Sequence, residues 1–339
     1  MMNYEMFKGI VETELSNFLD DEYKDMKVFI KPSHKINVIR DAVILRDTKK
    51  NTEFSISPML FLDDMFRMYQ QCESLPEVMN IIAGRIKEGM LVAPEVMKKV
   101  DFDNCKDKII WQLINTDQNK ALLSDCPHRD INDLSVIYRV VVDERDGLVM
   151  SSIITDPIAK VMGVNEQELF ELASENTQRL YPVQIQNLNE MIKEMFTDQG
   201  VPEEAIDVMT EEIPENSCMY VITNSRQVNG AVSMLYIDKL DELAEKIGDD
   251  LYILPSSIHE VLAVSKSMGD PEMLEDMVYQ VNTYQVPLED RLSNCVYHYD
   301  RTAKTLTPAT DNPIKSIDDK STDKVAEKSM SYEAKPIRK

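Results

Sequence analysis

Glycine, tryptophan and histidine are scarce in this sequence of 339 residues, which has nine glycines, one tryptophan and four histidines. Few glycines argue against glycine-rich phosphate-binding loops and against many tight hairpins, because both use backbone conformations that glycine adopts most easily. The G-x-S-x-G motif, which presents the nucleophile of many hydrolases, does not occur. Two common signatures of nucleotide and ester chemistry are therefore missing.

Paired cysteines and long apolar runs are missing as well. The five cysteines are scattered and form no C-x-x-C pair, so the sequence does not indicate a zinc ribbon or a thioredoxin-like centre. No apolar run reaches the roughly 18 residues that a membrane span needs. The opening residues, MMNYEMFKGIVETEL, are amphipathic and acidic rather than secretory. We expect a soluble, reduced, cytoplasmic protein that has no membrane partner.

Basic residues are outnumbered, because 37 Lys and Arg stand against 60 Asp and Glu, for a net charge of −23. A field of that sign repels nucleic-acid phosphate, so we do not expect a nucleic-acid partner. Adjacent carboxylates such as Asp249 and Asp250 are frequent for the same reason, and we interpret nearly all of them as solvated surface. Solubility explains such a surface, and binding to a basic partner or, more remotely, mimicry of nucleic acid are alternatives.

Hydrophobic periodicity divides the chain into two units and a tail. Residues 1–100 form a small unit, with helices predicted at 4–19, 59–71 and 75–88 and extended segments at 26–31, 38–45 and 53–57. Residues 101–310 form a larger unit. Its strands are predicted at 108–115, 134–142, 149–154, 218–223, 251–254, 260–264, 295–299 and 305–307, and its helices at 156–162, 165–180, 183–197, 232–247 and after Asp270-Pro271.

The fold class that follows is α+β, with mixed or antiparallel sheets and helices packed against them. Residues 311–339 have few apolar side chains and charges of both signs, which predicts a disordered tail. A capping box is predicted at Asn165, where Glu168 follows three residues later.

Two polar clusters contain histidine, and they supply the residue types of a hydrolase: a nucleophile, a base and an orienting acid. The candidate catalytic residues are Ser256, Ser257, His259 and Glu260 in one cluster and His128 and Asp130 in the other. The structural interpretation of the first cluster is a hairpin turn, in which Pro255 fixes the backbone, the serines bond local backbone and Glu260 is solvated.

A metal site is a further hypothesis, since imidazole and carboxylate ligands suit zinc, iron or manganese. Its candidate ligands are His128, Asp130, His259 and Glu260, without an H-E-x-x-H motif to support them. No cofactor is implied by any motif.

Methionine is abundant, with 21 residues. Several lie on predicted helical stripes, including Met65, Met68, Met273 and Met277. We expect them to fill the core, and the alternative is an adaptable peptide-binding surface.

Several blocks resemble a known family over roughly residues 1–310. They include MMNYEMFKGIV at 1–11, ELFELASENTQRLYP at 168–182, DLYILPSSIHEVLAVS at 250–265 and LSNCVYHYD at 292–300. On these residues the chain resembles an uncharacterised bacterial family of gut clostridial anaerobes, the domain of unknown function numbered fifty-six eighty-eight. The resemblance implies no reaction, cofactor or catalytic residue.

We therefore expect a non-enzymatic interaction or accessory protein whose partner is another protein. The alternative is a hydrolase or metal-dependent enzyme, which requires His128 and His259 to meet. The sequence does not determine the oligomeric state.

Overall fold

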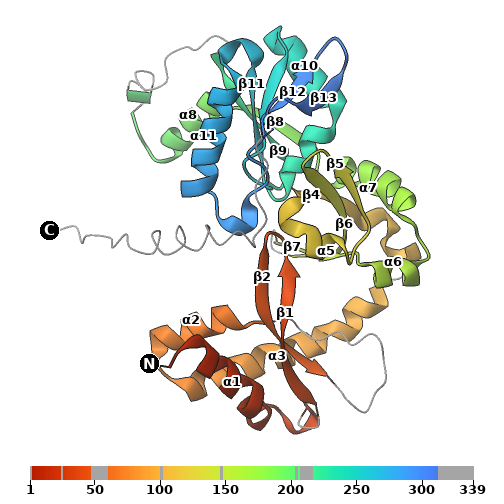
Figure 1. The fold of residues 1–339 in the computed structure, drawn as a ribbon, viewed down its shortest axis with the longest axis vertical. Helices are drawn as coiled ribbons and strands as arrows, with labels where there is room; N and C mark the ends of the chain where they lie inside the picture. Colours follow the sequence, from red (N-terminus) through yellow and green to blue (C-terminus); the bar gives the residue numbers. More distant parts are fainter. Residues whose placement is uncertain are drawn as a thin grey trace, which may run out of the picture. The chain divides into compact units, whose positions relative to one another are not determined.

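The computed structural model describes residues 2–23, 26–46, 60–99, 102–145, 148–202, 205–206 and 217–311. The extended segment expected at 53–57 and the tail expected after residue 311 lie outside these ranges. The chain divides into two compact units (Figure 1). The first contains Met1–Lys106 and Val142–Met150, and the second contains Asp107–Val141 and Ser151–Lys339.

The first unit packs helices against a small antiparallel sheet. Its sheet has the order β1 (Lys27–Lys35), β2 (Val38–Arg46) and β3 (Leu60–Phe61). Its helices are α1 (Tyr4–Glu14), continued by the 3-10 turn η1 (Leu15–Phe18), then α2 (Leu62–Cys72), α3 (Leu75–Lys99) and the short α4 (Phe102–Cys105). Phe7, Val11 and Leu15 are fully buried along the stripe that predicted the first helix. The helix expected at 75–88 begins as predicted but continues to Lys99.

A four-stranded sheet, most of whose residues belong to the second unit, is built on a wholly buried strand, β4 (Ile109–Asn115). β6 (Leu134–Arg145) pairs antiparallel with β4 and with β5 (His128–Ile131), and β7 (Leu148–Ile153) also pairs with β6. The strands expected at 108–115, 134–142 and 149–154 are thus confirmed. α7 (Glu166–Leu180) covers β4, where the Thr177 hydroxyl accepts the Trp111 N–H at 2.8 Å.

Two helices in this part of the chain begin where the sequence predicts. α6 (Asp156–Met162) matches its predicted range, and α7 has the capping box predicted at Asn165, with both of its hydrogen bonds formed. The start of α7 is set by local sequence, because the capping side chain and the amide it binds are within three residues of one another.

The second sheet has six strands in the order β13-β12-β10-β11-β9-β8, and every neighbouring pair is antiparallel. Its strands are β8 (Val183–Asn187), β9 (Met219–Asn224), β10 (Leu251–Leu254), β11 (Val261–Ser265), β12 (Tyr297–Asp300) and β13 (Thr305–Pro308). Around it lie α8 (Leu188–Asp198), the 3-10 helix η6 (Gly230–Leu235), α10 (Ile237–Ile247) and α11 (Pro271–Tyr284) (Figure 1). Together with the sheets of the other segments, this arrangement confirms the α+β class.

Two expected helices differ in the structure. The helix expected at 183–197 is wrong at its start, because residues 183–187 are the strand β8 and only Leu188–Asp198 is helical. The alternation in VQIQN has the period of a strand, and pairing with β9 decides for it. The helix expected at 232–247 is split into η6 and α10, since Tyr236 between them has an extended backbone.

Across the described ranges, no helix has both the length and the apolar character that crossing a membrane requires.

Candidate functional site

The candidate turn at 255–259 is paired with a second segment instead of facing solvent as a simple hairpin. The Ile258 N–H donates to the Asp290 carbonyl at 2.8 Å, and the Ser293 N–H donates to the Pro255 carbonyl at 2.8 Å. Ser257 is only 5% exposed. Its hydroxyl oxygen accepts the backbone N–H of His259 at 3.0 Å, which is the local bonding that the structural interpretation predicted. Ser256 and Glu260 are half-buried beside it.

His259 uses both of its ring nitrogens in contacts with neighbouring segments. Nδ1 lies 3.2 Å from the backbone N of Asn229, and Nε2 lies 3.3 Å from Oδ1 of Asp290. A backbone amide only donates, so Nδ1 accepts and the proton of the neutral ring is on Nε2, facing the carboxylate. In this geometry His259 has no lone pair left with which to take a proton from a serine hydroxyl.

His128 lies in the other sheet and has different partners. Its Nδ1 is 2.9 Å from the carbonyl oxygen of Cys126, and its Nε2 is 3.9 Å from Oδ1 of Asp130. Asp130 also accepts the hydroxyl of Ser135 at 2.7 Å. The structure thus brings His128 to Asp130 and His259 to Ser257.

No hydrogen bond or ion pair links these two groups within the described part of the chain. Over the same residues, no group of three or more His, Cys, Asp or Glu side chains is arranged to hold a metal ion. The hydrolase and metal hypotheses centred on His128 and His259 stay predictions.

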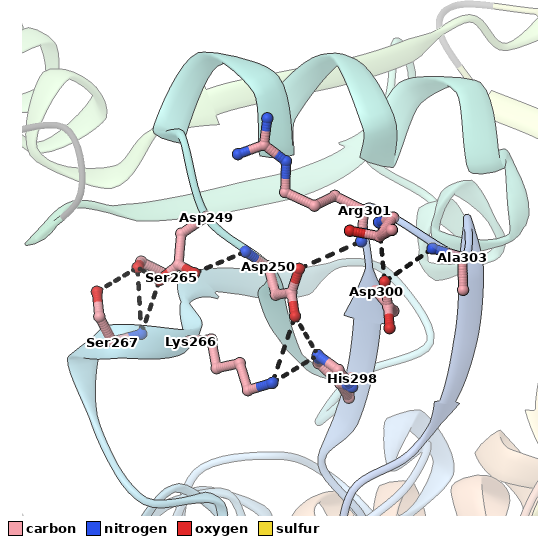
Figure 2. A network of polar contacts seen from close by, with 10 residues as sticks. Asp249, Asp250, Ser265, Lys266, Ser267, His298, Asp300, Arg301 and Ala303 are labelled. Atoms are coloured by element: carbon pink, nitrogen blue, oxygen red, sulfur yellow. Dashed lines mark hydrogen bonds and ion pairs between the residues drawn. The ribbon is translucent and has the colours of Figure 1, made fainter.

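A larger polar network, which sequence reasoning did not single out, lies where β10, β11 and β12 meet the adjoining loops (Figure 2). Asp250 accepts His298 Nε2 at 2.9 Å, Lys266 Nζ at 3.3 Å and the backbone N–H of Arg301 at 3.3 Å. His298 and Lys266 are also 3.3 Å apart, and both face the same carboxylate oxygen, Oδ2. Asp250 is therefore the acceptor that joins the three segments.

Its neighbour Asp249 organises the other half of the network. The Asp249 carboxylate accepts the hydroxyl of Ser265 at 2.6 Å and the backbone N–H of Ser267 at 2.9 Å (Figure 2). The Asp249-Asp250 pair is thus an exception to the expectation that adjacent carboxylates are solvated. This exception could have been recognised in the sequence from the position of the pair, because Asp249 and Asp250 directly precede a strand that is buried throughout.

Electrostatics in this network favour ionised carboxylates. Burial by itself raises the pKa of Asp250. The hydrogen bonds from His298, the Arg301 amide and Lys266 lower the pKa by more than burial raises it, so the pKa lies below its ordinary value. The pKa of Asp249 is depressed in the same way, with Ser265 and Ser267 as donors that outweigh burial. A network of donors closed around two anions cross-links strands and is suited to stability.

Exposed apolar side chains are concentrated on α11 and at its two ends. Five of the ten exposed large hydrophobic residues of the described chain lie between residues 268 and 288. We call these five the α11 surface: Met268, Met273, Tyr279, Tyr284 and Leu288. The opposite side of α11 is buried, since Val278 joins a core cluster with Tyr252, Leu254, Val264 and Val296 of the sheet.

The burial of individual methionines distinguishes core filling from an adaptable binding surface. Met65 is buried in the core of the first unit, as expected. The same expectation is wrong for Met273, whose exposed fraction is 71%. Met277, one turn later, is partly buried against the sheet cluster. A flexible, polarisable side chain in water suits the alternative interpretation, an adaptable binding surface.

Comparison with known proteins identifies a family. The model of a family described as "Family of unknown function (DUF5688)" matches residues 4–301. No match was found among curated proteins or among solved structures.

Proposed function

Since the chain belongs to DUF5688, a family of unknown function, we propose its function from its own surface: it is a non-enzymatic cytoplasmic interaction protein. Its partner is another protein, which binds the α11 surface through a basic segment that also carries apolar side chains.

The observation that carries the proposal is the concentration of exposed apolar groups around one helix. Tyr284 is 80% exposed and Met273 is 71% exposed, and the two lie on one side of α11. Contiguous exposed apolar surface on a folded protein commonly marks an interaction site. Tyrosine and methionine are also enriched in the buried centres of interfaces. Both facts favour a protein partner over a small ligand.

The charge of the surroundings specifies the partner further. Glu272 and Asp276 are exposed on the same helix, and the whole chain has a net charge of −23. An acidic field attracts basic segments and accelerates their encounter, and this attraction weakens as salt is added. The partner therefore presents Lys or Arg around its apolar residues.

The test uses a variant of the full chain in which Met273→Ser and Tyr284→Ser are combined. Affinity capture from a lysate of the source cell is followed by identification of any stoichiometric partner and by titration with that purified partner. Because truncation of a central interface residue commonly costs about 1–2 kcal/mol, we expect the double variant to lose at least about tenfold in affinity. Raising the salt concentration weakens the wild-type complex.

Val161→Ser is the matched control. Val161 is 69% exposed on α6, so its substitution removes a similarly exposed apolar group outside the α11 surface. Binding at wild-type strength by this control supports the assignment. Equal binding by the double variant and the wild type, or the absence of any stoichiometric partner, contradicts it.

A further inference from the structure

Arg139 lies on β6 and is partly buried. Its guanidinium group donates hydrogen bonds only to neutral acceptors among the described residues. Its Nε donates to the hydroxyl of Ser151 at 2.9 Å, and its Nη2 donates to the carbonyl of the same residue at 2.9 Å. Its Nη1 donates to Oε1 of Gln112 at 3.1 Å. The side chain is held in one plane by two strands, since Gln112 lies on β4 and Ser151 on β7.

No described carboxylate lies within ion-pair distance of this guanidinium. Two other partly buried arginines have a carboxylate partner: Arg129 meets Glu166 at 2.8 Å, and Arg40 meets Asp63 at 2.6 Å. Burial lowers the pKa of Arg139 to about 10, which still leaves it charged at neutral pH. A charge withdrawn from water normally has a counter-charge, because desolvation without one is costly. The cation at Arg139 is therefore uncompensated within the described side chains.

The guanidinium also has unused donors. It carries five N–H groups, and three of them donate to Ser151 and Gln112, so two have no acceptor among the described residues. Hydrogen bonding to Ser151 and Gln112 does not need a cation, since a neutral amide would satisfy the same acceptors. The fork geometry of arginine matches phosphate and carboxylate groups, which accept two parallel N–H bonds.

Neighbouring residues hold the Arg139 guanidinium and its partner Gln112 in a fixed orientation. Gln112 Oε1 accepts from Arg139 while its Nε2 donates to Oδ1 of Asn229 at 2.8 Å, so the amide has one orientation. Asn229 in turn donates its backbone N–H to His259, and its φ of 53° places it in the left-handed region. A receptor that is already ordered loses less entropy when it binds.

We propose that Arg139 is the receptor of a small oxyanion ligand, a phosphate or a carboxylate, which binds through the two remaining N–H groups and supplies the missing negative charge. Gln112 and Ser151 are positioning residues that orient the guanidinium. This oxyanion site is independent of the α11 surface, because it involves different residues and a different kind of ligand.

The test titrates the full chain with inorganic phosphate and, separately, with acetate, against sodium chloride at the same ionic strength. Isothermal calorimetry and the thermal unfolding midpoint are both followed. We expect one of the two anions to bind saturably and to raise the midpoint, because a ligand that binds only the folded state stabilises it. Which anion binds distinguishes a phosphate ligand from a carboxylate ligand. If neither anion binds saturably to the wild type, the proposal is overturned.

Three variants assign the binding to this side chain. Arg139→Met removes the charge and is expected to abolish binding, and Arg139→Lys keeps the charge without the fork and is expected to weaken it at least about tenfold. Arg179→Met is the control, because Arg179 is exposed and is also hydrogen-bonded to neutral acceptors, the Asp107 carbonyl and Asn176 Oδ1. If Arg139→Met fails to fold, Arg139→Lys and the wild type decide. Wild-type affinity in either Arg139 variant contradicts the proposal.

Discussion

Replacing Gly230 by alanine tests whether the candidate turn at 255–259 is as tightly packed as its hydrogen bonds indicate. A Cβ atom at Gly230 would lie 2.2 Å from Oγ1 of Thr223, 2.6 Å from the carbonyl oxygen of His259 and 2.7 Å from the backbone N of Asn224. Contacts of real Cβ atoms are essentially never shorter than 3.0 Å. Two of the three atoms belong to the backbone, so rotation of a side chain cannot relieve the clash.

The size of the destabilisation follows from the atoms that the added methyl group displaces. The Thr223 hydroxyl donates to the His259 carbonyl at 2.8 Å, so a shift that accommodates the methyl group also breaks this bond. Forcing an extra methyl group into a packed site costs about 1–3 kcal/mol, and losing a hydrogen bond costs about 0.5–1.5 kcal/mol. We expect Gly230→Ala to lower the free energy of unfolding by about 3 kcal/mol.

The assay is urea unfolding of the full chain, followed by tryptophan fluorescence. Trp111 is the sole tryptophan and is buried in the second unit, so its emission reports on the unit that contains Gly230. Gly269→Ala is the matched control, because Gly269 has extended backbone and no atom within 4 Å of an added Cβ. We expect the control to stay within about 0.5 kcal/mol of the wild type. A loss below about 1 kcal/mol in Gly230→Ala would refute the reasoning.

Two further predictions concern ionisable groups. The depressed pKa of Asp250 contributes stability that is present above the pKa of an unfolded aspartate, about 3.9, and is lost as the pH falls through the folded value. Asp250→Asn is therefore expected to be less stable than the wild type at pH 7 by about 1–3 kcal/mol, because its donors lose a charged acceptor. The variant should also lose less stability between pH 5 and pH 2, and equal acid slopes of the urea midpoint for the two proteins would contradict this. Burial raises the pKa of the Cys126 thiol to about 12, whereas Cys72 is exposed. Because the thiolate is the reactive form, we expect a disulfide reagent at pH 8 to modify Cys72 promptly in the native chain and to spare Cys126. A Cys72→Ser variant should lose the fast phase, and an undiminished fast phase would show that a buried thiol is accessible.

Local patterns predicted much of the fold. α6 matches its predicted range, and the capping box at Asn165 is formed as predicted. The capping box depends on residues within one helical turn, so it can be recognised without knowing the rest of the chain. The buried strand β4 was recognisable for a similar reason, since a short apolar run with β-branched residues favours a strand.

The sequence-based predictions fail where contacts with residues far apart in the chain determine the local structure. Residues 183–187 pair with β9, more than thirty residues later, and that pairing makes them a strand instead of the first turn of a helix. Met65 and Met273 look equivalent in the sequence, yet one is buried and the other is exposed. A stripe of apolar residues shows that a helix has an apolar side, but the packing of neighbouring elements decides how much of that side is covered.

The same division applies to the candidate sites. The sequence alone determined the family, the α+β class, the acidic charge and the residue types of the histidine clusters, because each depends on composition or short-range pattern. Only the tertiary structure decided that both ring nitrogens of His259 are engaged, that Asp250 joins three segments and that Arg139 has only neutral acceptors among the described residues. These are contacts between residues far apart in the chain, and the distance and direction of such contacts are set when the sheets form.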